Sequence, residues 1–133
     1  MKKYKIAVLT ILLISLITGC KSESSEKTSG KVYEQISQEQ AKALIDSQKD
    51  CIILDVRTEE EYAEEHIPGS MCIPNETIDD TVTSLLPDKN KLILVYCRSG
   101  NRSKQASKKL IALGYTNIKE FGGINTWPYE TER

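Results

Sequence analysis

The sequence has few of the residue types from which metal sites and nucleic-acid sites are built. It contains one histidine, one tryptophan and one phenylalanine, and aromatic residues make up only 6% of its 133 residues. A lone histidine without a matching cysteine spacing does not make a zinc site. Acidic side chains outnumber basic ones by 19 to 18, and by four once residues 1–19 with their three lysines are set aside, which argues against a nucleic-acid-binding protein. We therefore expect no metal, no organic cofactor and no nucleic-acid partner.

Long apolar runs are also scarce. The longest, residues 6–18, is interrupted by Thr10 and Ser15 and follows a lysine-rich head. It is too short to cross a bilayer comfortably, because a spanning helix needs about 20 apolar residues. A basic head followed by a short apolar stretch is typical of a secretory signal peptide. We predict that residues 1–19 are such a signal and take no part in the fold.

The end of this signal carries a more specific pattern. Residues 17–20 read Ile-Thr-Gly-Cys and resemble the lipobox of bacterial lipoproteins, whose cysteine is diacylated and becomes the new N-terminus. The alternative is a plain signal peptide with an incidental cysteine. The resemblance implies lipidation at Cys20, which would anchor the chain to the membrane on its extracytoplasmic side, in the cell envelope.

The segment after Cys20 reads as a linker. Residues 21–31 contain no apolar side chain and cannot bury surface, so we expect a flexible tether over residues 20–31 and one folded domain over residues 32–133. Removal of residues 1–19 lowers the formal net charge by three, from −1 to −4. Basic side chains nevertheless cluster within residues 98–109, so a local anion site remains possible on an acidic chain.

The domain itself shows an alternating pattern of strands and helices. Two runs rich in β-branched residues, 51–56 and 91–96, suit buried parallel strands. Each precedes a helical pattern: Thr58 and Glu61 form a capping box, and residues 103–113 carry an apolar face that ends before Gly114. With 39% apolar and 28% charged residues, this alternation predicts a single α/β domain with a mainly parallel central sheet and helices on both faces.

The remaining elements are shorter. A second capping box, Ser37 with Gln40, predicts a helix over residues 38–47. We expect a turn and a short strand within residues 67–74, a helix over 77–86 that ends at Pro87, a last strand over 117–121 and a helical turn near Trp127. Ligands of such folds bind at the carboxyl ends of the strands, and Cys97 lies at one of these ends.

The residues after the second strand form a candidate anion site. Residues 97–102 read Cys-Arg-Ser-Gly-Asn-Arg and lead into the next helix. Loop amides, together with the first amides of that helix, can bind an anion. The helix dipole and two arginines favour a thiolate over a thiol, which makes Cys97 a candidate nucleophile. The alternative, a buried structural cysteine, does not explain two arginines and a glycine within five residues. The predicted substrate-binding set is Arg98, Ser99, Gly100, Asn101, Arg102 and Ser103.

This loop resembles the active-site loop of rhodanese-family sulfurtransferases, which often reads Cys-Arg-x-Gly-x-Arg. The family's other motifs are matched by residues 54–57 (Leu-Asp-Val-Arg), 61–62 (Glu-Tyr), 66–69 (His-Ile-Pro-Gly), 122–123 (Gly-Gly) and 127–128 (Trp-Pro). The resemblance implies a rhodanese-like fold and thiosulfate sulfurtransferase activity. In that chemistry, the Cys97 thiolate takes the outer sulfur of thiosulfate as a persulfide, and cyanide or a thiol then accepts it. Of the two arginines, we expect Arg102 to be the principal anion ligand.

Two alternatives remain open. Phosphatases and arsenate reductases related to rhodanese place five residues between their cysteine and an arginine, and that arginine would fall at position 103, which is a serine. The loop length therefore favours sulfur transfer. The second alternative is a persulfide carrier or thiol-redox partner of another envelope protein. Cys72 could then be a resolving thiol, or it could be a half-buried spectator, whereas Cys51 begins a core strand and is expected to be inert.

Four residues of the matched signature are assigned structural roles: Asp55, Arg57, Glu61 and His66. Arg57 can pair with Glu61, and Glu61 is also the acid of the capping box. His66 precedes a turn at residues 67–69, and a thiolate that the loop already stabilises needs no general base.

Overall fold

The structure, a computed structural model, describes residue 30 and residues 32–133. The predicted signal peptide (residues 1–19), Cys20 and the predicted tether apart from Gly30 lie outside these residues. Within the described part of the chain, no helix combines the length and the apolar character that a membrane crossing requires. The lipid anchor stays a prediction.

The described residues form one five-stranded sheet in which every neighbouring pair of strands is parallel. β4 (Ile93–Cys97) is the middle strand of the order β1-β5-β4-β2-β3, and all its residues are buried. β2 (Ile52–Asp55) and β5 (Ile118–Gly123) flank it, and the two-residue strands β1 (Glu34–Gln35) and β3 (Met71–Cys72) form the edges. The apolar runs predicted as buried strands are thus two neighbouring inner strands.

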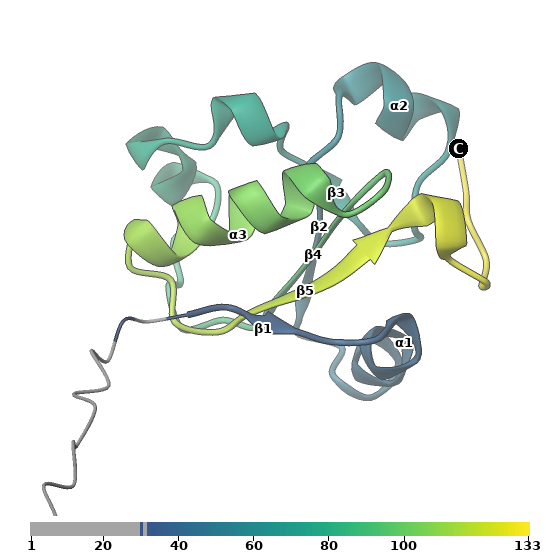
Figure 1. The fold of residues 1–133 in the computed structure, drawn as a ribbon, viewed down its shortest axis with the longest axis horizontal. Helices are drawn as coiled ribbons and strands as arrows, with labels where there is room; N and C mark the ends of the chain where they lie inside the picture. The colour runs from purple at the N-terminus through teal and green to yellow at the C-terminus, as the bar shows by residue number, and fades with distance from the viewer. Residues whose placement is uncertain (1–29, 31) are drawn as a thin grey trace, which may run out of the picture.

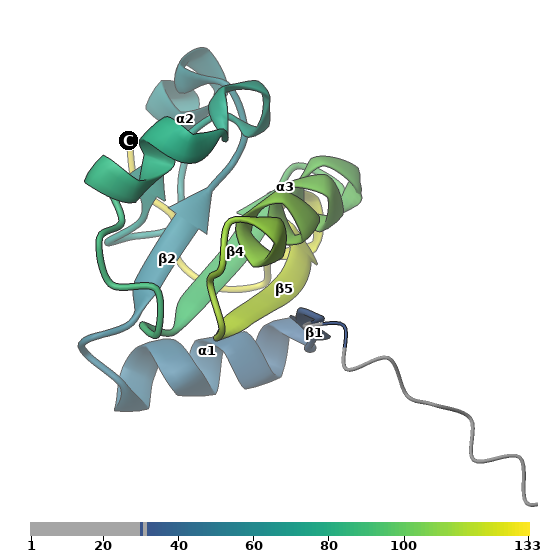
Figure 2. The same cartoon turned by 90° about the vertical axis from the view of Figure 1, so that its left-hand side faces the viewer.

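Helices cover both faces of the sheet, which confirms the predicted α/β class (Figures 1 and 2). α1 (Gln38–Ser47) packs on one face, and α3 (Asn101–Ala112) packs on the other together with the 3-10 helix η2 (Asp80–Ser84). α2 (Glu59–Glu64) follows β2 on the α3 side, and the 3-10 helices η1 (Asn75–Thr77) and η3 (Ile124–Thr126) lie in the connections. Because β2 and β4 are parallel neighbours, the loops that follow them lie side by side at the carboxyl ends of the strands.

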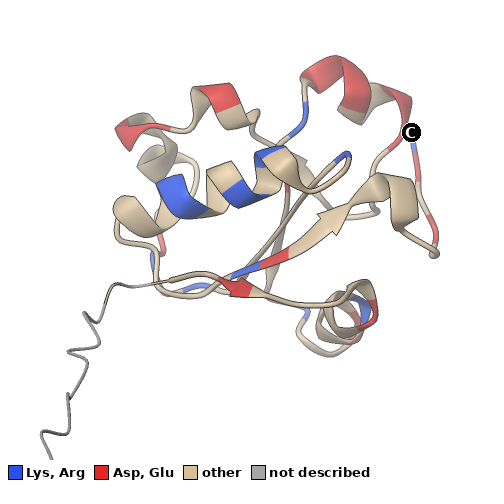
Figure 3. Ribbon diagram, viewed as in Figure 1, with Lys and Arg blue, Asp and Glu red and all other residues tan. Residues whose placement is uncertain are grey.

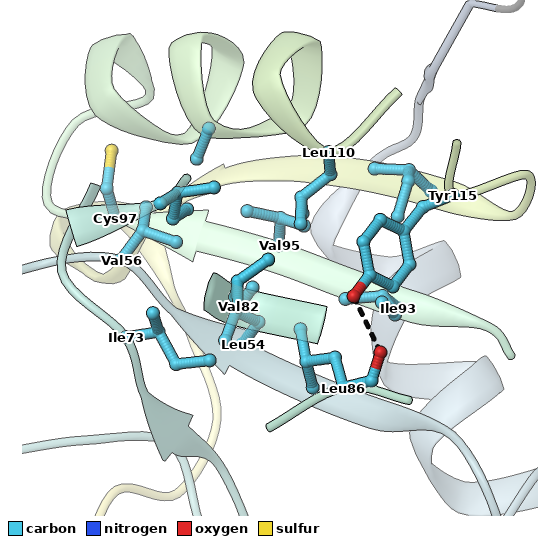
Figure 4. Close-up of a cluster of buried hydrophobic side chains, with 13 residues drawn as sticks. Leu54, Val56, Ile73, Val82, Leu86, Ile93, Val95, Cys97, Leu110 and Tyr115 are labelled. Carbon is cyan, nitrogen blue, oxygen red and sulfur yellow. Dashed lines mark hydrogen bonds between the residues drawn. The ribbon is translucent and has the colours of Figure 1, made fainter. Parts of the chain in front are cut away.

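Two apolar clusters hold these layers together. The cluster between the sheet and α3 contains Leu54, Val82, Val95 and Leu110, and it ends at Cys97 (Figure 4). On the opposite face, Ala41 of α1 packs in a cluster with Ile53, Leu94, Tyr96 and Phe121. Burial of each large apolar side chain contributes about 1.5–3 kcal/mol. β4 is therefore fixed from both sides, and Cys97 sits at the end of a rigid strand.

Most predicted elements are confirmed, and one is wrong. Both capping boxes form, at Ser37 for α1 and Thr58 for α2. The helix predicted over residues 77–86 is instead a pair of 3-10 helices, η1 and η2. The side chain of Asp79 accepts the backbone N–H of Thr81, and the hydroxyls of Thr83 and Ser84 donate to nearby carbonyls. Such local bonds compete with an α-helix.

Candidate active site

Cys97 lies at the junction between β4 and the loop that leads to α3. Only 1% of its surface is exposed, and the backbone N–H of Gly100 donates to its sulfur at 3.0 Å. Figure 4 shows the sulfur of Cys97 at one end of the apolar cluster, with Tyr115 at the other. The loop therefore wraps around the sulfur and presents a backbone donor to it, which favours negative charge at this position.

The start of α3 is left open. Its N-cap is Gly100, which has a φ of 107° and no side chain to cap the helix. A φ in this region suits glycine, whereas other residues would be strained. The first amides of a helix have no partner within the helix, so an uncapped start offers them to an anion. The predicted ligands Ser99 and Asn101 are exposed beside this start.

The back of the loop rests directly on Gly123 of β5. A Cβ atom at this position would lie 2.0 Å from the carbonyl oxygen of Arg98 and 2.5 Å from the nitrogen of Ser99. No side chain fits there, so the loop can approach the strand only because residue 123 is glycine. The N–H of Asn125 also donates to the Arg98 carbonyl at 3.1 Å. The Gly-Gly pair was noted in the sequence as a family motif, but its contact with the loop is visible only in the fold.

The two loop arginines differ in their partners. Arg102 forms two hydrogen bonds with the carboxylate of Glu61, at 2.7 and 3.0 Å. The bonds from Arg102 lower the pKa of Glu61 to about 2. Arg98 is exposed and forms no ion pair with any described residue. Arg102 was expected to be the principal anion ligand, but its guanidinium is already paired with the carboxylate of Glu61. Arg98 is therefore the cation that is freer to bind an anion.

A cleft of about 780 Å³ opens beside the loop, next to Arg98. Arg98, Ile124 and Asn125 are among its lining residues, together with Arg57, Glu61 and residues 63–65 of α2 and its C-cap, and the C-terminal residues 131–133. Figure 3 shows acidic residues along α2 and basic residues on the loop and α3. Cys97 does not line the cleft, but its chain neighbour Arg98 does, so the cleft lies directly beside the loop that carries Cys97.

Asp55 and Arg57 form a buried ion pair in the loop after β2. Their side chains are 0% and 5% exposed, and Nη2 of Arg57 lies 2.6 Å from a carboxylate oxygen of Asp55. Arg57 also donates to the carbonyl of Glu65 at 2.5 Å. The expected pairing of Arg57 with Glu61 does not form, because Glu61 instead joins Arg102 and the capping box of Thr58. These contacts hold the neighbouring loop rigid beside the site.

His66 is tied to the scaffold on all sides. Its ring stacks on Tyr62 with the ring centroids 3.8 Å apart, and Nδ1 lies 2.8 Å from the Tyr62 carbonyl. Its backbone forms a bridge with Glu132, and Nε2 lies 3.3 Å from the Glu132 carboxylate. Both ring nitrogens thus have partners outside the loop, as a structural role requires.

Cys72 lies on the opposite face of the sheet from Cys97. Its register partner is Asp55, which in turn pairs with Tyr96. Register partners share a face and successive residues alternate, so Cys97 points to the other side. Burial, followed by the charge of Asp55, raises the pKa of Cys72 to about 11. Cys72 is thus poorly placed to resolve a disulfide with Cys97, and burial also raises the pKa of Cys51.

One buried acid beneath the loop was not singled out in the sequence. Glu120 of β5 is 3% exposed, and Oε1 accepts a hydrogen bond from the Ser103 hydroxyl at 2.6 Å. Ser103, predicted as a substrate ligand, is fully buried and accepts from the Cys97 thiol at 3.4 Å. The available signal was weak, because β5 contains two adjacent charged residues, Lys119 and Glu120, of which only Glu120 is buried. Residues 30 and 32–133 contain no cluster of histidine, cysteine or acidic residues that could hold a metal.

Comparisons with known proteins agree with this geometry. The family described as Rhodanese-like domain matches residues 37–129. Thiosulfate sulfurtransferase PspE of Escherichia coli is 38% identical over 71 residues, which are 53% of this chain and 68% of the relative. Thiosulfate sulfurtransferase GlpE of Coxiella burnetii is 33% identical over 97 residues, 72% of this chain and 88% of the relative. Among solved structures, a rhodanese with anions from E. coli superposes with a TM-score of 0.57 at 33% identity, covering 62% of this chain and 96% of that one.

Proposed function

The chain belongs to the rhodanese-like domain family, and from this premise we propose that it is a thiosulfate sulfurtransferase in which Cys97 carries sulfane sulfur as a persulfide. The observation that carries the proposal is the cysteine sulfur that accepts the Gly100 N–H at the uncapped start of α3. The relatives named as thiosulfate sulfurtransferases support the same donor.

The proposed reaction has two halves. Cys97 attacks the outer sulfur of thiosulfate, a Cys97–sulfur bond forms, and sulfite leaves with the electron pair of the broken sulfur–sulfur bond. Cyanide or a thiolate then attacks the outer sulfur, and the bonding electrons return to Cys97. The open amides stabilise the charge on the donor and then on the terminal sulfur. Arg98 attracts the anion, and the contribution of Arg102 is limited by its pair with Glu61.

Position 103 argues against a phosphatase. A Cys-x5-Arg loop would place a guanidinium at this position to hold a tetrahedral oxyanion. Ser103 is instead fully buried and points its hydroxyl toward Cys97 and Glu120. Without an arginine at this position the loop lacks the guanidinium that a phosphatase of this type needs, which supports sulfur as the transferred group.

A persulfide carrier that serves a partner protein is the second candidate. The cleft beside Arg98 is the feature that favours it, because a carrier needs a surface where a partner can reach the loop. The thiol-redox version of this candidate is weaker, since Cys72 lies on the other face of the sheet. Anchoring of the chain through Cys20 would place either activity at the outer surface of a membrane.

The test is thiosulfate-dependent turnover of the purified chain with cyanide as acceptor, together with intact mass spectrometry. We expect thiocyanate production and a mass gain of one sulfur atom, and both should vanish in Cys97→Ser. A sulfur adduct without turnover would favour the carrier. Absence of both in reduced, folded protein would refute a persulfide at Cys97. Cys72→Ser, the matched control, should keep the adduct and the turnover.

A further inference from the structure

Glu120, Ser103 and Cys97 form a buried chain of hydrogen bonds beneath the active-site loop. The Cys97 thiol donates to Ser103 Oγ at 3.4 Å, and Ser103 Oγ lies 2.6 Å from Glu120 Oε1. The three side chains are 1%, 0% and 3% exposed. Nothing in the sulfur-transfer steps above uses this carboxylate, although it is the buried acid linked to the nucleophile.

The distances fix the direction of the hydrogen bonds. Ser103 Oγ also lies 3.0 Å from the Gly100 carbonyl and 3.4 Å from the Gly122 carbonyl, but a hydroxyl has only one proton. The 2.6 Å contact has the length typical of a hydroxyl that donates to a carboxylate. With its proton directed to Glu120, Ser103 keeps its lone pairs for the Cys97 thiol. The thiol proton therefore points into the protein, away from the loop amides.

Glu120 is held in place without a cation. Oε1 also accepts the backbone N–H of Gly122 at 2.8 Å, and no described lysine or arginine forms an ion pair with this carboxylate. Titratable and charged side chains on β1, β4, β5 and α3 around it are Glu34, Tyr96, Cys97, Arg102, Lys104, Lys108, Lys109 and Lys119. Of these, only Cys97 is connected to it: Tyr96 bonds Ile67 and Ser70, Arg102 binds Glu61, Lys109 binds the Asn75 carbonyl, Lys119 binds Glu34, and Lys104 and Lys108 are exposed. α1 packs on the opposite face of the sheet, where Lys42 pairs with Asp46 and Glu39 is exposed.

We propose that Glu120 accepts the proton of the Cys97 thiol through the Ser103 hydroxyl during attack on the sulfur donor, and returns it after the acceptor has taken the sulfur. Glu120 is thus a positioning residue that acts through Ser103. The inference rests on the proposed sulfurtransferase function and adds a proton route to it.

The transfer balances within the site. As the bond between Cys97 and the outer sulfur forms, the thiol proton moves to Ser103 Oγ and the proton of Ser103 moves to Glu120 Oε1. Afterwards Glu120 donates to Ser103, and Ser103 can donate to the Cys97 sulfur. The pair carries one negative charge as thiol with carboxylate, and one as anionic persulfide with carboxylic acid. Persulfide formation then adds no charge to a buried site, where an additional charge would be costly.

The test compares Glu120→Gln with the unmodified chain. The amide oxygen of glutamine can still accept from Ser103 and Gly122, but the amide cannot take up a proton. We expect the single-turnover rate of persulfide formation from thiosulfate to be nearly independent of pH between about 6 and 8 in the unmodified chain, where thiosulfate does not titrate. In Glu120→Gln the proton must leave to solvent, so the rate should fall about tenfold per pH unit on the acid side.

Two further variants complete the design. Ser103→Ala breaks the proton route while Glu120 remains, and it should show the same acid-side slope, so it decides the question if Glu120→Gln does not fold. Glu34→Gln removes an exposed acid from the neighbouring strand and should keep the unmodified profile. A flat profile in both Glu120→Gln and Ser103→Ala, with the sulfur adduct still on Cys97, overturns the proton route alone. Absence of the adduct in the unmodified chain overturns the proposed function, and the proton route with it.

Discussion

Two strand-loop-helix units, residues 52–64 and 93–112, lie side by side and have the same plan, but the backbone N–H groups at the starts of their helices have different partners. In the closed unit, residues 52–64, Thr58 and Glu61 bond each other's backbone N–H groups, so these two amides at the start of α2 have side-chain partners. In the open unit, residues 93–112, α3 starts at Gly100 without a side-chain cap. The two units have the same plan and lie side by side at the carboxyl ends of the strands. We therefore expect the chemistry to depend on the backbone N–H groups at the start of α3, which no side chain caps.

The charges follow the same division. The first turn of α2 contains Glu59, Glu60 and Glu61, whereas the first turn of α3 has no acid. The closed unit also contains the buried pair of Asp55 with Arg57. We infer that the closed unit acts as scaffold and the open unit as reaction site. The pair of Arg102 with Glu61 is the ionic link between them.

The largest effect on stability is expected from Asp55→Asn in the closed unit. The substitution leaves the buried Arg57 without its counter-charge, which costs about 3–5 kcal/mol. Urea unfolding should show a lower midpoint. At urea concentrations where the variant is folded, Cys97 should still take up sulfur.

Cys97→Ser is the matched variant in the open unit. It should remove the sulfur adduct while the unfolding midpoint changes little. The hydroxyl of serine is only slightly smaller than the thiol of cysteine, and it still accepts the N–H of Gly100. A large loss of stability in Cys97→Ser, or an unchanged midpoint in Asp55→Asn, would contradict the division into scaffold and reaction site.

Gly123→Ala in the open unit should reduce both the stability of the fold and the rate of reaction with thiosulfate. Its new methyl group would meet the Arg98 carbonyl at 2.0 Å, so the loop must move. Overpacking of this kind costs about 1–3 kcal/mol, and a loop displaced by 1 Å can cost about a hundredfold in rate. Urea unfolding and the thiosulfate rate together measure the two effects. Gly69→Ala, at a glycine with no atom near its added methyl, should reduce stability through backbone strain at its positive φ but leave the rate unchanged; equal rate losses would refute the contact argument.

Thr58→Ala tests the closed helix start. Loss of an N-cap hydroxyl costs about 1 kcal/mol, and the cost should appear as a lower midpoint of unfolding. The sulfur-transfer rate of the folded variant should stay within about twofold, which corresponds to a change of about 0.4 kcal/mol in the barrier. A fall in the rate of the folded variant by a larger factor would show that the closed unit takes part in the reaction.

Much of this arrangement could be predicted because its signals are local. The capping boxes at Ser37 and Thr58 involve residues three positions apart, and the two inner strands are continuous apolar runs. The loop after β4 was predicted as the candidate site because a cysteine, a glycine and two arginines occur together there. Local patterns therefore predicted the fold class correctly and singled out Cys97 as the candidate nucleophile.

The remaining features depend on contacts between residues far apart in the chain. Arg102 meets Glu61 across 41 residues, and Ser103 meets Glu120 across 17. The faces of Cys72 and Cys97 follow from strand register, which the sequence of a strand does not reveal. The wrong helix at residues 77–86 has a different cause, because the side chain of Asp79 and its hydroxyl neighbours favoured 3-10 turns over an α-helix.

The smallest effect is expected from Glu61→Gln, which tests the link between the two units. Glutamine can keep the capping box but loses the charge that pairs with Arg102, and a partly exposed pair contributes about 0.2–1 kcal/mol. The pKa of Glu61 is lowered to about 2 by Arg102, so the contribution is complete above the unfolded-state pKa of about 4.3. It is lost as pH falls through the folded-state value. Urea unfolding should therefore separate the variant from the unmodified chain at pH 7, and the two curves should converge toward pH 2. A stability difference that persists unchanged in acid would mean that Glu61 stabilises the fold through packing or capping, and that the ion pair contributes nothing.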